Sequence, residues 1–190
     1  VWDWLRIFAP QAKYGGWATR MLADAYGGDE AEEANARTGC IGCPLAARDK
    51  ALEAVIALPA WSYLAPLLGL RPIYRELRLA RNRLRQPGGE RRKDGTLVPN
   101  QQRMGPITLA ARLDALGRIL AIQAACNVEA DRLGRPRVDI INAEEEARIL
   151  ELIALRTWPQ KWSGDEPTAD TPLDAVFSDG SVQPLLIPAE

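Results

Sequence analysis

Apolar residues recur at helical spacing along most of the chain, and this pattern predicts a mainly α protein. The longest segment of this kind covers residues 107–133 and is introduced by Gly105-Pro106, where the proline suits the first position of a helix. Its expected buried stripe consists of Leu109, Leu113, Leu116, Leu120 and Ala124. Residues 134–136, Gly-Arg-Pro, end the predicted helix, and residues 138–141 are expected to form a short strand or an extended link.

Shorter helices are predicted over residues 1–8, 14–26 and 45–58. A further helix through residue 156 is predicted to begin at Asn142, because Asn142 followed by Glu145 resembles a capping box. The Asp-Gly step in the sequence RRKDGTLV, residues 91–98, is typical of a β-hairpin. The predicted fold is therefore an irregular helical domain with a CxxC turn and room for one small β-hairpin.

Residues 72–86 form the most clearly amphipathic segment. Ile73, Leu77, Ala80 and Leu84 fall on one helical face, and arginines fall on another. We expect a single helix here that presents a basic stripe.

The pattern also suggests how the chain is divided. Residues 1–156 are expected to form the helical domain, and residues 157–190, with five prolines, an ordered wrap or a mobile tail. The chain opens on Val1 and runs directly into the apolar segment VWDWLRIF, so we expect it to be the C-terminal part of a longer protein.

The amino-acid composition excludes several kinds of catalytic and metal-binding site. The 190 residues include no histidine, which excludes a Ser-His-Asp triad, a Cys-His dyad and a His-ligated zinc site. Three cysteines are too few for a disulfide framework and favour a reducing, cytoplasmic setting. There is no signal peptide pattern and no apolar run of about 18 residues, so we expect no contact with a membrane.

Cys40-x-x-Cys43 lies in a glycine-containing turn and is the sharpest local feature. Two thiolates at this spacing can point at one centre, which suits an iron–sulfur cluster, zinc or a redox dithiol. The alternative is two small buried side chains at a turn. Cys126, on the predicted long helix, is either a third ligand or an ordinary buried cysteine.

Basic residues are concentrated between residues 71 and 93, where nine basic and two acidic residues stand in a chain of net charge −1. Such a region can neutralise phosphates, or it is a solvated face that pairs with acidic groups. The candidate nucleic-acid-binding residues are Arg71, Arg75, Arg78, Arg81, Arg85, Arg91, Arg92 and Lys93.

Four motifs in order resemble one protein family. They are VWDWL at residues 1–5, TGCIGCP at 38–44, DKALEA at 49–54, and RMGPITL at 103–109 followed by Arg112. The set is similar to the phosphoadenosine-phosphosulfate reductase family of PP-loop ATP pyrophosphatase-like proteins, and to its DndC-type branch, which works in DNA phosphorothioation.

This resemblance implies a parent enzyme that activates its substrate with ATP and carries a 4Fe-4S cluster. It implies Cys40, Cys43 and Cys126 as cluster ligands, a cysteine desulfurase and other DNA-modification proteins as partners, and DNA as the molecule that is modified. The family's pyrophosphate loop is absent from these residues. ATP is therefore expected only on a nucleotide-binding domain upstream, and this chain alone is not expected to be active.

Two other functions are compatible with the same residues. The first is a fragment of an enzyme that resembles the sulfonucleotide reductases, although the Cys-Gly-Leu-His tail of those reductases is absent. The second is a helical interaction module without a cluster, whose basic helix docks onto an acidic protein.

Overall fold

The computed structural model describes residues 3–16, 19, 41–87, 90–98, 100, 102–171, 174–177 and 179–184. The chain forms two compact units. Unit 1 consists of Val1–Tyr74 and Ala121–Ile140, and unit 2 of Arg75–Leu120 and Ile141–Glu190. The boundary predicted between residues 156 and 157 lies inside unit 2.

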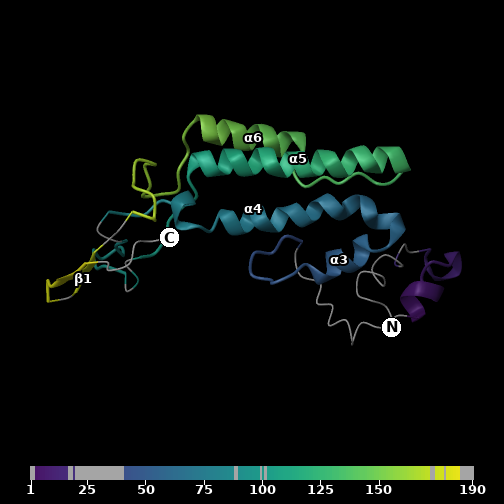
Figure 1. Ribbon diagram of the computed structural model, residues 1–190, viewed down its shortest axis with the longest axis horizontal. Coiled ribbons are helices and arrows are strands. Elements are labelled where there is room, and N and C mark those ends of the chain that lie inside the picture. The colour runs from purple at the N-terminus through teal and green to yellow at the C-terminus, as the bar shows by residue number, and fades with distance from the viewer. Residues whose placement is uncertain are drawn as a thin grey trace. The chain divides into compact units, whose positions relative to one another are not determined.

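The predicted mainly α fold with one small β-hairpin is confirmed (Figure 1). The α-helices are α3 (Lys50–Ile56), α4 (Leu70–Glu76), α5 (Leu109–Leu133) and α6 (Ala143–Ala154). A π-helix, η1 (Trp4–Phe8), and 3₁₀ helices η2 (Ala12–Tyr14), η4 (Pro59–Gly69) and η5 (Ala80–Asn82) complete the described helices. The helix predicted over residues 14–26 falls mainly outside the described residues. Among the described helices, none is long and apolar enough to cross a bilayer.

The β-hairpin lies near the C-terminus, at a different place from the predicted one. Strands β1 (Ala175–Val176) and β2 (Val182–Gln183) pair antiparallel, with Val176 opposite Val182. The Asp-Gly step at residues 94–95 does form a tight turn, closed by one isolated bridge between Arg91 and Leu97. Residues 157–171 belong to unit 2, where Ala169 is buried and its N–H donates to the carbonyl of Arg83 at 2.7 Å.

The core of unit 1 forms between the η4–α4 segment, α3 and the second half of α5. Helix α3 packs against η4, and the buried side chains are Leu52, Tyr63, Leu67, Leu70, Ile73, Cys126 and Ala130. A Cβ on Gly69 would lie 2.9 Å from Cδ1 of Ile122, so the end of η4 lies close to α5.

The predicted strand over residues 138–141 does not form, and this segment is an irregular link with bends at residues 140 and 141. Asn127 on α5 holds this segment through both of its amide atoms, which bond the N–H and the carbonyl of Val138 at 2.7 and 2.9 Å. Oε1 of Gln123 accepts the N–H of Ile140 at 2.6 Å. Side chains of α5 thus satisfy backbone groups that a sheet partner would otherwise bond.

The buried stripe predicted for α5 is only partly right. Leu116 is buried, but Leu113 is 50 % exposed and Ala124 is exposed. The buried face also carries small or polar residues, namely Ala115, Cys126, Asn127 and Ala130. Because small side chains allow close packing and Asn127 bonds the link, the buried face does not follow the largest apolar residues.

The single amphipathic helix predicted over residues 72–86 is wrong. Helix α4 ends at Glu76, and Arg83 and Leu84 are extended. The N–H of Leu84 donates to the carbonyl of Pro106, and the N–H of Arg85 to that of Pro167, both at 2.9 Å. Tertiary backbone bonds therefore replace the helical ones, and the arginines of this segment do not share one helical face.

The capping box at the start of α6 is confirmed. The side chain of Asn142 accepts the N–H of Glu145, whose carboxylate accepts the N–H of Asn142. The helix ends at Ala154, two residues before the predicted end, because Arg156 adopts a left-handed φ of 50°. The N–H of Arg156 bonds the carbonyl of Ile153 and that of Thr157 the carbonyl of Leu152, which is the Schellman pattern.

Replacing Arg156 with Gly should raise the free energy of unfolding by roughly 1 kcal/mol, because glycine adopts this conformation without the steric cost of a Cβ. The ion pair of Arg156 with Asp165 is exposed, so its loss should matter little. Urea unfolding of both proteins measures the difference. An unchanged or lower stability would contradict this account of the helix end.

Candidate functional site

The cysteine turn is held by the backbone of Gly42, next to Cys43. Gly42 is buried, has a left-handed φ of 77°, and donates its N–H to Oδ2 of Asp49 at 3.2 Å. Its Cα faces Leu70 and Tyr74, and a Cβ there would lie 2.8 Å from Cβ of Leu70. The turn therefore lies directly against α4 and leaves no room for a side chain at position 42.

Asp49 is itself fixed by Arg71. Nη2 of Arg71 lies 2.6 Å from Oδ1 of Asp49, and the two side chains are only 11 % and 6 % exposed. Nη1 of Arg71 donates to the carbonyl of Ala47 at 2.8 Å, while its Nε is buried with no partner in the described part of the chain. A buried ion pair thus connects α4 to the cysteine turn.

The thiols differ in their surroundings. Cys43 is half-buried and Cys126 is fully buried, and both are free. Cys40 lies outside the described residues. Burial raises the pKa of the Cys126 thiol, while a hydrogen bond with the backbone of Leu67 acts in the opposite direction. Cys126 is therefore built to be a neutral, packed thiol unless a metal ion displaces its proton.

Within the described ranges, no three Cys, Asp or Glu side chains converge to hold a metal ion. Cys43 and Cys126 both belong to unit 1. Cys126 packs against η4 and Gly42 against α4, which follows η4 directly. The structure therefore describes two of the three predicted cluster ligands, Cys43 and Cys126. The third predicted ligand, Cys40, lies outside the described residues.

No family model, curated protein or solved structure matches this chain.

The eight candidate nucleic-acid-binding residues divide into two groups. Arg71 and Arg85 are in the interior, Arg71 on Asp49 and Arg85 with Nη1 on the carbonyl of Thr171 at 3.1 Å. Burial lowers the pKa of Arg85, and the charge of Asp170 opposes this shift. These two arginines therefore have structural roles, because each bonds another segment of its own unit. The other six are exposed, namely Arg75, Arg78, Arg81, Arg91, Arg92 and Lys93.

The last three of these lie in a loop that the structure organises locally. Oδ1 of Asp94 accepts both the N–H and the hydroxyl of Thr96, at 2.9 and 2.7 Å, and these bonds lower the pKa of Asp94. Nη1 of Arg91 donates to the carbonyl of Gly95 at 2.9 Å. The Asp-Gly turn thereby holds the backbone of the basic residues that precede it.

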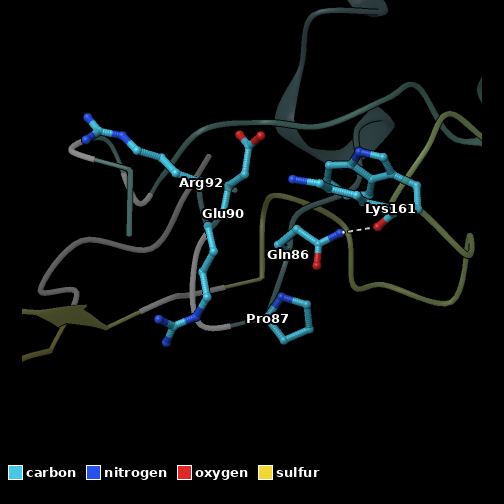
Figure 2. A pocket seen from close by; sticks show the side chains of 7 residues that line it. Gln86, Pro87, Glu90, Arg92 and Lys161 are labelled. Carbon is cyan, nitrogen blue, oxygen red and sulfur yellow. Dashed lines mark hydrogen bonds between the residues drawn. The ribbon is translucent and has the colours of Figure 1, made fainter. Parts of the chain in front are cut away.

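The structure brings residues to this loop that the sequence analysis did not select as site residues. Lys161 and Trp162, about 70 positions later in the chain, line a hollow together with Gln86 and Glu90–Arg92 (Figure 2). Nε2 of Gln86 donates to the carbonyl of Lys161 at 2.9 Å, which connects the two segments. The only sequence signal is the pair of tryptophans in WPQKW, residues 158–162, and it indicates packing more than binding.

The first tryptophan of that motif has a structural role. The guanidinium of Arg112 lies 4.9 Å from the centre of the Trp158 ring, and Gly164 allows the ring to approach the backbone. Burial, and to a smaller extent the charge of Arg83, lower the pKa of Arg112. Arg112, one of the residues in the family resemblance, thus packs within unit 2.

Proposed function

We propose that this chain is the iron–sulfur-binding C-terminal part of a DndC-like sulfurtransferase that works in DNA phosphorothioation. The observation that carries the proposal is the cysteine turn, which a buried Asp49–Arg71 pair and a side-chain-free Gly42 fix against α4. An ordinary surface turn needs neither feature. A buried ion pair costs desolvation energy, so its bond to the backbone of Gly42, next to Cys43, favours a turn whose exact geometry matters.

The donor chemistry fits a thiolate-bound cluster. Cys40 and Cys43 would be the principal ligands and Cys126 the third, with no histidine in the chain to compete. When bound, a 4Fe-4S cluster with three protein ligands supplies one iron with an open position that can hold sulfide for transfer. The chain's own contribution is to fix Cys43 and to exclude water around Cys126, which is fully buried.

The exposed basic residues of unit 2 fit the second half of the proposal. Arg75, Arg78 and Arg81 are exposed, and in this proposal they neutralise phosphates without reading sequence. In this proposal, sulfur arrives from a cysteine desulfurase in the cytoplasm, where thiols stay reduced, and a nucleotide-binding domain upstream activates the DNA with ATP.

Serine substitutions at the cysteines test the cluster. Anaerobically purified wild-type protein should be brown, and Cys40→Ser and Cys43→Ser should each lose the visible absorbance while the far-ultraviolet circular dichroism is retained. Cys126→Ser should lower the absorbance without abolishing it, because burial raises the pKa of the Cys126 thiol and so disfavours its thiolate. Colourless wild-type protein with bound zinc would refute the cluster.

A cluster-free interaction module is the second candidate, and the full burial of Cys126 favours it. In that case Cys126 is only a packing residue, and Cys126→Ala should change stability but leave every spectrum unchanged. A loss of visible absorbance in Cys126→Ala, at unchanged circular dichroism, would exclude this candidate.

A further inference from the structure

Unit 2 contains an open hollow with a strongly basic lining. It consists of two adjoining cavities of about 250 and 570 Å³, which share Glu90, Arg91, Arg92 and Lys161. We call the two together the basic hollow. Figure 2 shows the side chains of the smaller cavity, with the bond from Gln86 to Lys161 dashed.

Most of the charges that line the basic hollow form no ion pair with residues in the described ranges. Its lining has five cations, Arg91, Arg92, Lys93, Arg103 and Lys161, against one carboxylate, Glu90. Arg103 takes up that carboxylate, with Nη1 at 3.1 Å from Oε2 of Glu90. Arg92, Lys93 and Lys161 form no ion pair with any residue that the structure describes. Cations gathered without counter-charges indicate an anionic ligand.

An aromatic ring accompanies these cations. Trp162 lines the smaller cavity, and its six-membered ring lies directly on Gly105, where a Cβ would overlap it. The ring therefore packs closely on the backbone of Gly105 and is half-buried. Proteins that bind single-stranded nucleic acids combine cations, which contact the phosphates, with aromatic side chains, on which the bases stack. Trp162 and the cations of the basic hollow form such a combination.

Lys161 has a backbone conformation that is unfavourable for a residue with a Cβ. Pro159 to Trp162 form a turn closed by the N–H of Trp162 on the carbonyl of Pro159 at 3.1 Å. Lys161 is its third residue and has a left-handed φ of 75°, a conformation that favours glycine at this position. Strained residues that persist are concentrated at functional sites. Here the strained residue carries one of the unpaired charges.

We propose that the basic hollow binds the phosphate backbone of a single-stranded nucleic-acid segment, with Trp162 against one base. In a duplex the bases are stacked on one another, so their faces cannot reach the ring. The proposal deepens the nucleic-acid half of the proposed function, and rests on it for the identity of the strand as DNA. The residues that line the basic hollow belong to unit 2, whereas the cysteine turn belongs to unit 1. The proposal for the hollow therefore uses none of the residues that support the cluster.

Lys161→Gly tests the hollow, with Arg156→Gly as a matched control. Each variant removes one positive charge and relieves one left-handed backbone, and these two are the non-glycine residues with positive φ in the described part of the chain. Arg156 does not line the hollow. Both variants should raise the thermal midpoint. Only Lys161→Gly should weaken the binding of a fluorescent single-stranded oligonucleotide to the full chain.

The salt dependence gives the expected size of the effect. The slope of log affinity against log salt should fall by about 0.7 for each phosphate contact that Lys161→Gly removes, and should stay unchanged in Arg156→Gly. An unchanged slope in Lys161→Gly would overturn the proposal for the hollow, even where the oligonucleotide still binds through Arg75, Arg78 and Arg81. The visible spectrum of the same samples reports the cluster independently.

Trp162 gives a second measurement. Trp162→Ala should weaken oligonucleotide binding about 5- to 150-fold, since stacking of one base contributes about 1–3 kcal/mol. Trp162→Phe keeps an aromatic ring and serves as the second variant if Trp162→Ala unfolds. It should retain the affinity for the oligonucleotide, but the quenching of the oligonucleotide's fluorescence on binding should be smaller, because the indole ring is absent. Equal affinity for a duplex of the same sequence, or displacement of the oligonucleotide by inorganic phosphate at equal phosphate concentration, would overturn the single-strand proposal.

Discussion

Asp49→Ala should lower the free energy of unfolding by about 3–5 kcal/mol, the usual cost of removing one partner from a buried ion pair. The variant leaves the guanidinium of Arg71, only 11 % exposed, without its carboxylate. It also removes the acceptor of the Gly42 N–H. Urea unfolding followed by circular dichroism measures the loss, and the slope of the transition should stay unchanged if the fold is otherwise intact.

The Arg48–Glu53 pair provides the control for this substitution. It has the same 2.6 Å separation between nitrogen and oxygen, but the Arg48 side chain is 70 % exposed. Glu53→Ala should therefore change stability little, because water solvates the arginine that remains. Equal effects of Asp49→Ala and Glu53→Ala would show that burial is not what makes the Asp49–Arg71 pair important.

Gly42→Ala should lower the free energy of unfolding by about 2–5 kcal/mol. A left-handed conformation costs an L residue about 1–2 kcal/mol, and forcing a methyl group into a packed site about 1–3 kcal/mol more. The methyl group would lie 2.8 Å from Cβ of Leu70 and 2.9 Å from Cε2 of Tyr74. Because the turn must move to accept it, the iron bound by anaerobically purified protein should fall as well.

Gly95→Ala separates the two costs. Gly95 has a similar φ of 86°, but a methyl group there would have nothing within 4 Å. Only the conformational cost remains, so we expect a loss of about 1–2 kcal/mol and no change in iron content. If Gly42→Ala were no more destabilising than Gly95→Ala, the close packing of the cysteine turn on α4 would be contradicted.

Features set by neighbouring residues were predictable from the sequence. The capping box depends on Asn142 and Glu145 alone, and the Asp-Gly turn on residues 92–96, so both are present. The prediction of a single helix over residues 72–86 is wrong because residues far away in the sequence determine the structure of this segment. Its helical periodicity is real, but Pro106 and Pro167 offer carbonyls to Leu84 and Arg85, and these distant groups decide the local structure.

In the candidate sites too, features that depend on neighbouring residues were predictable, and features that depend on tertiary packing were not. Spacing selected the cysteine turn, and composition selected the basic region, because both are visible in short stretches of sequence. Neither could separate the buried Arg71 and Arg85 from the exposed arginines, since burial depends on Asp49 and Thr171 as partners. The contribution of Lys161 and Trp162 to the basic hollow arises only from tertiary packing.

In the proposed function, the cysteine turn is part of an iron–sulfur site. The most direct measurement is the amount of iron, acid-labile sulfide and zinc bound per chain in protein purified without oxygen. We predict iron and sulfide in equal amounts, about four of each per chain for a 4Fe-4S cluster. Zinc without sulfide, or no bound metal in protein that is fully folded, would contradict the claim.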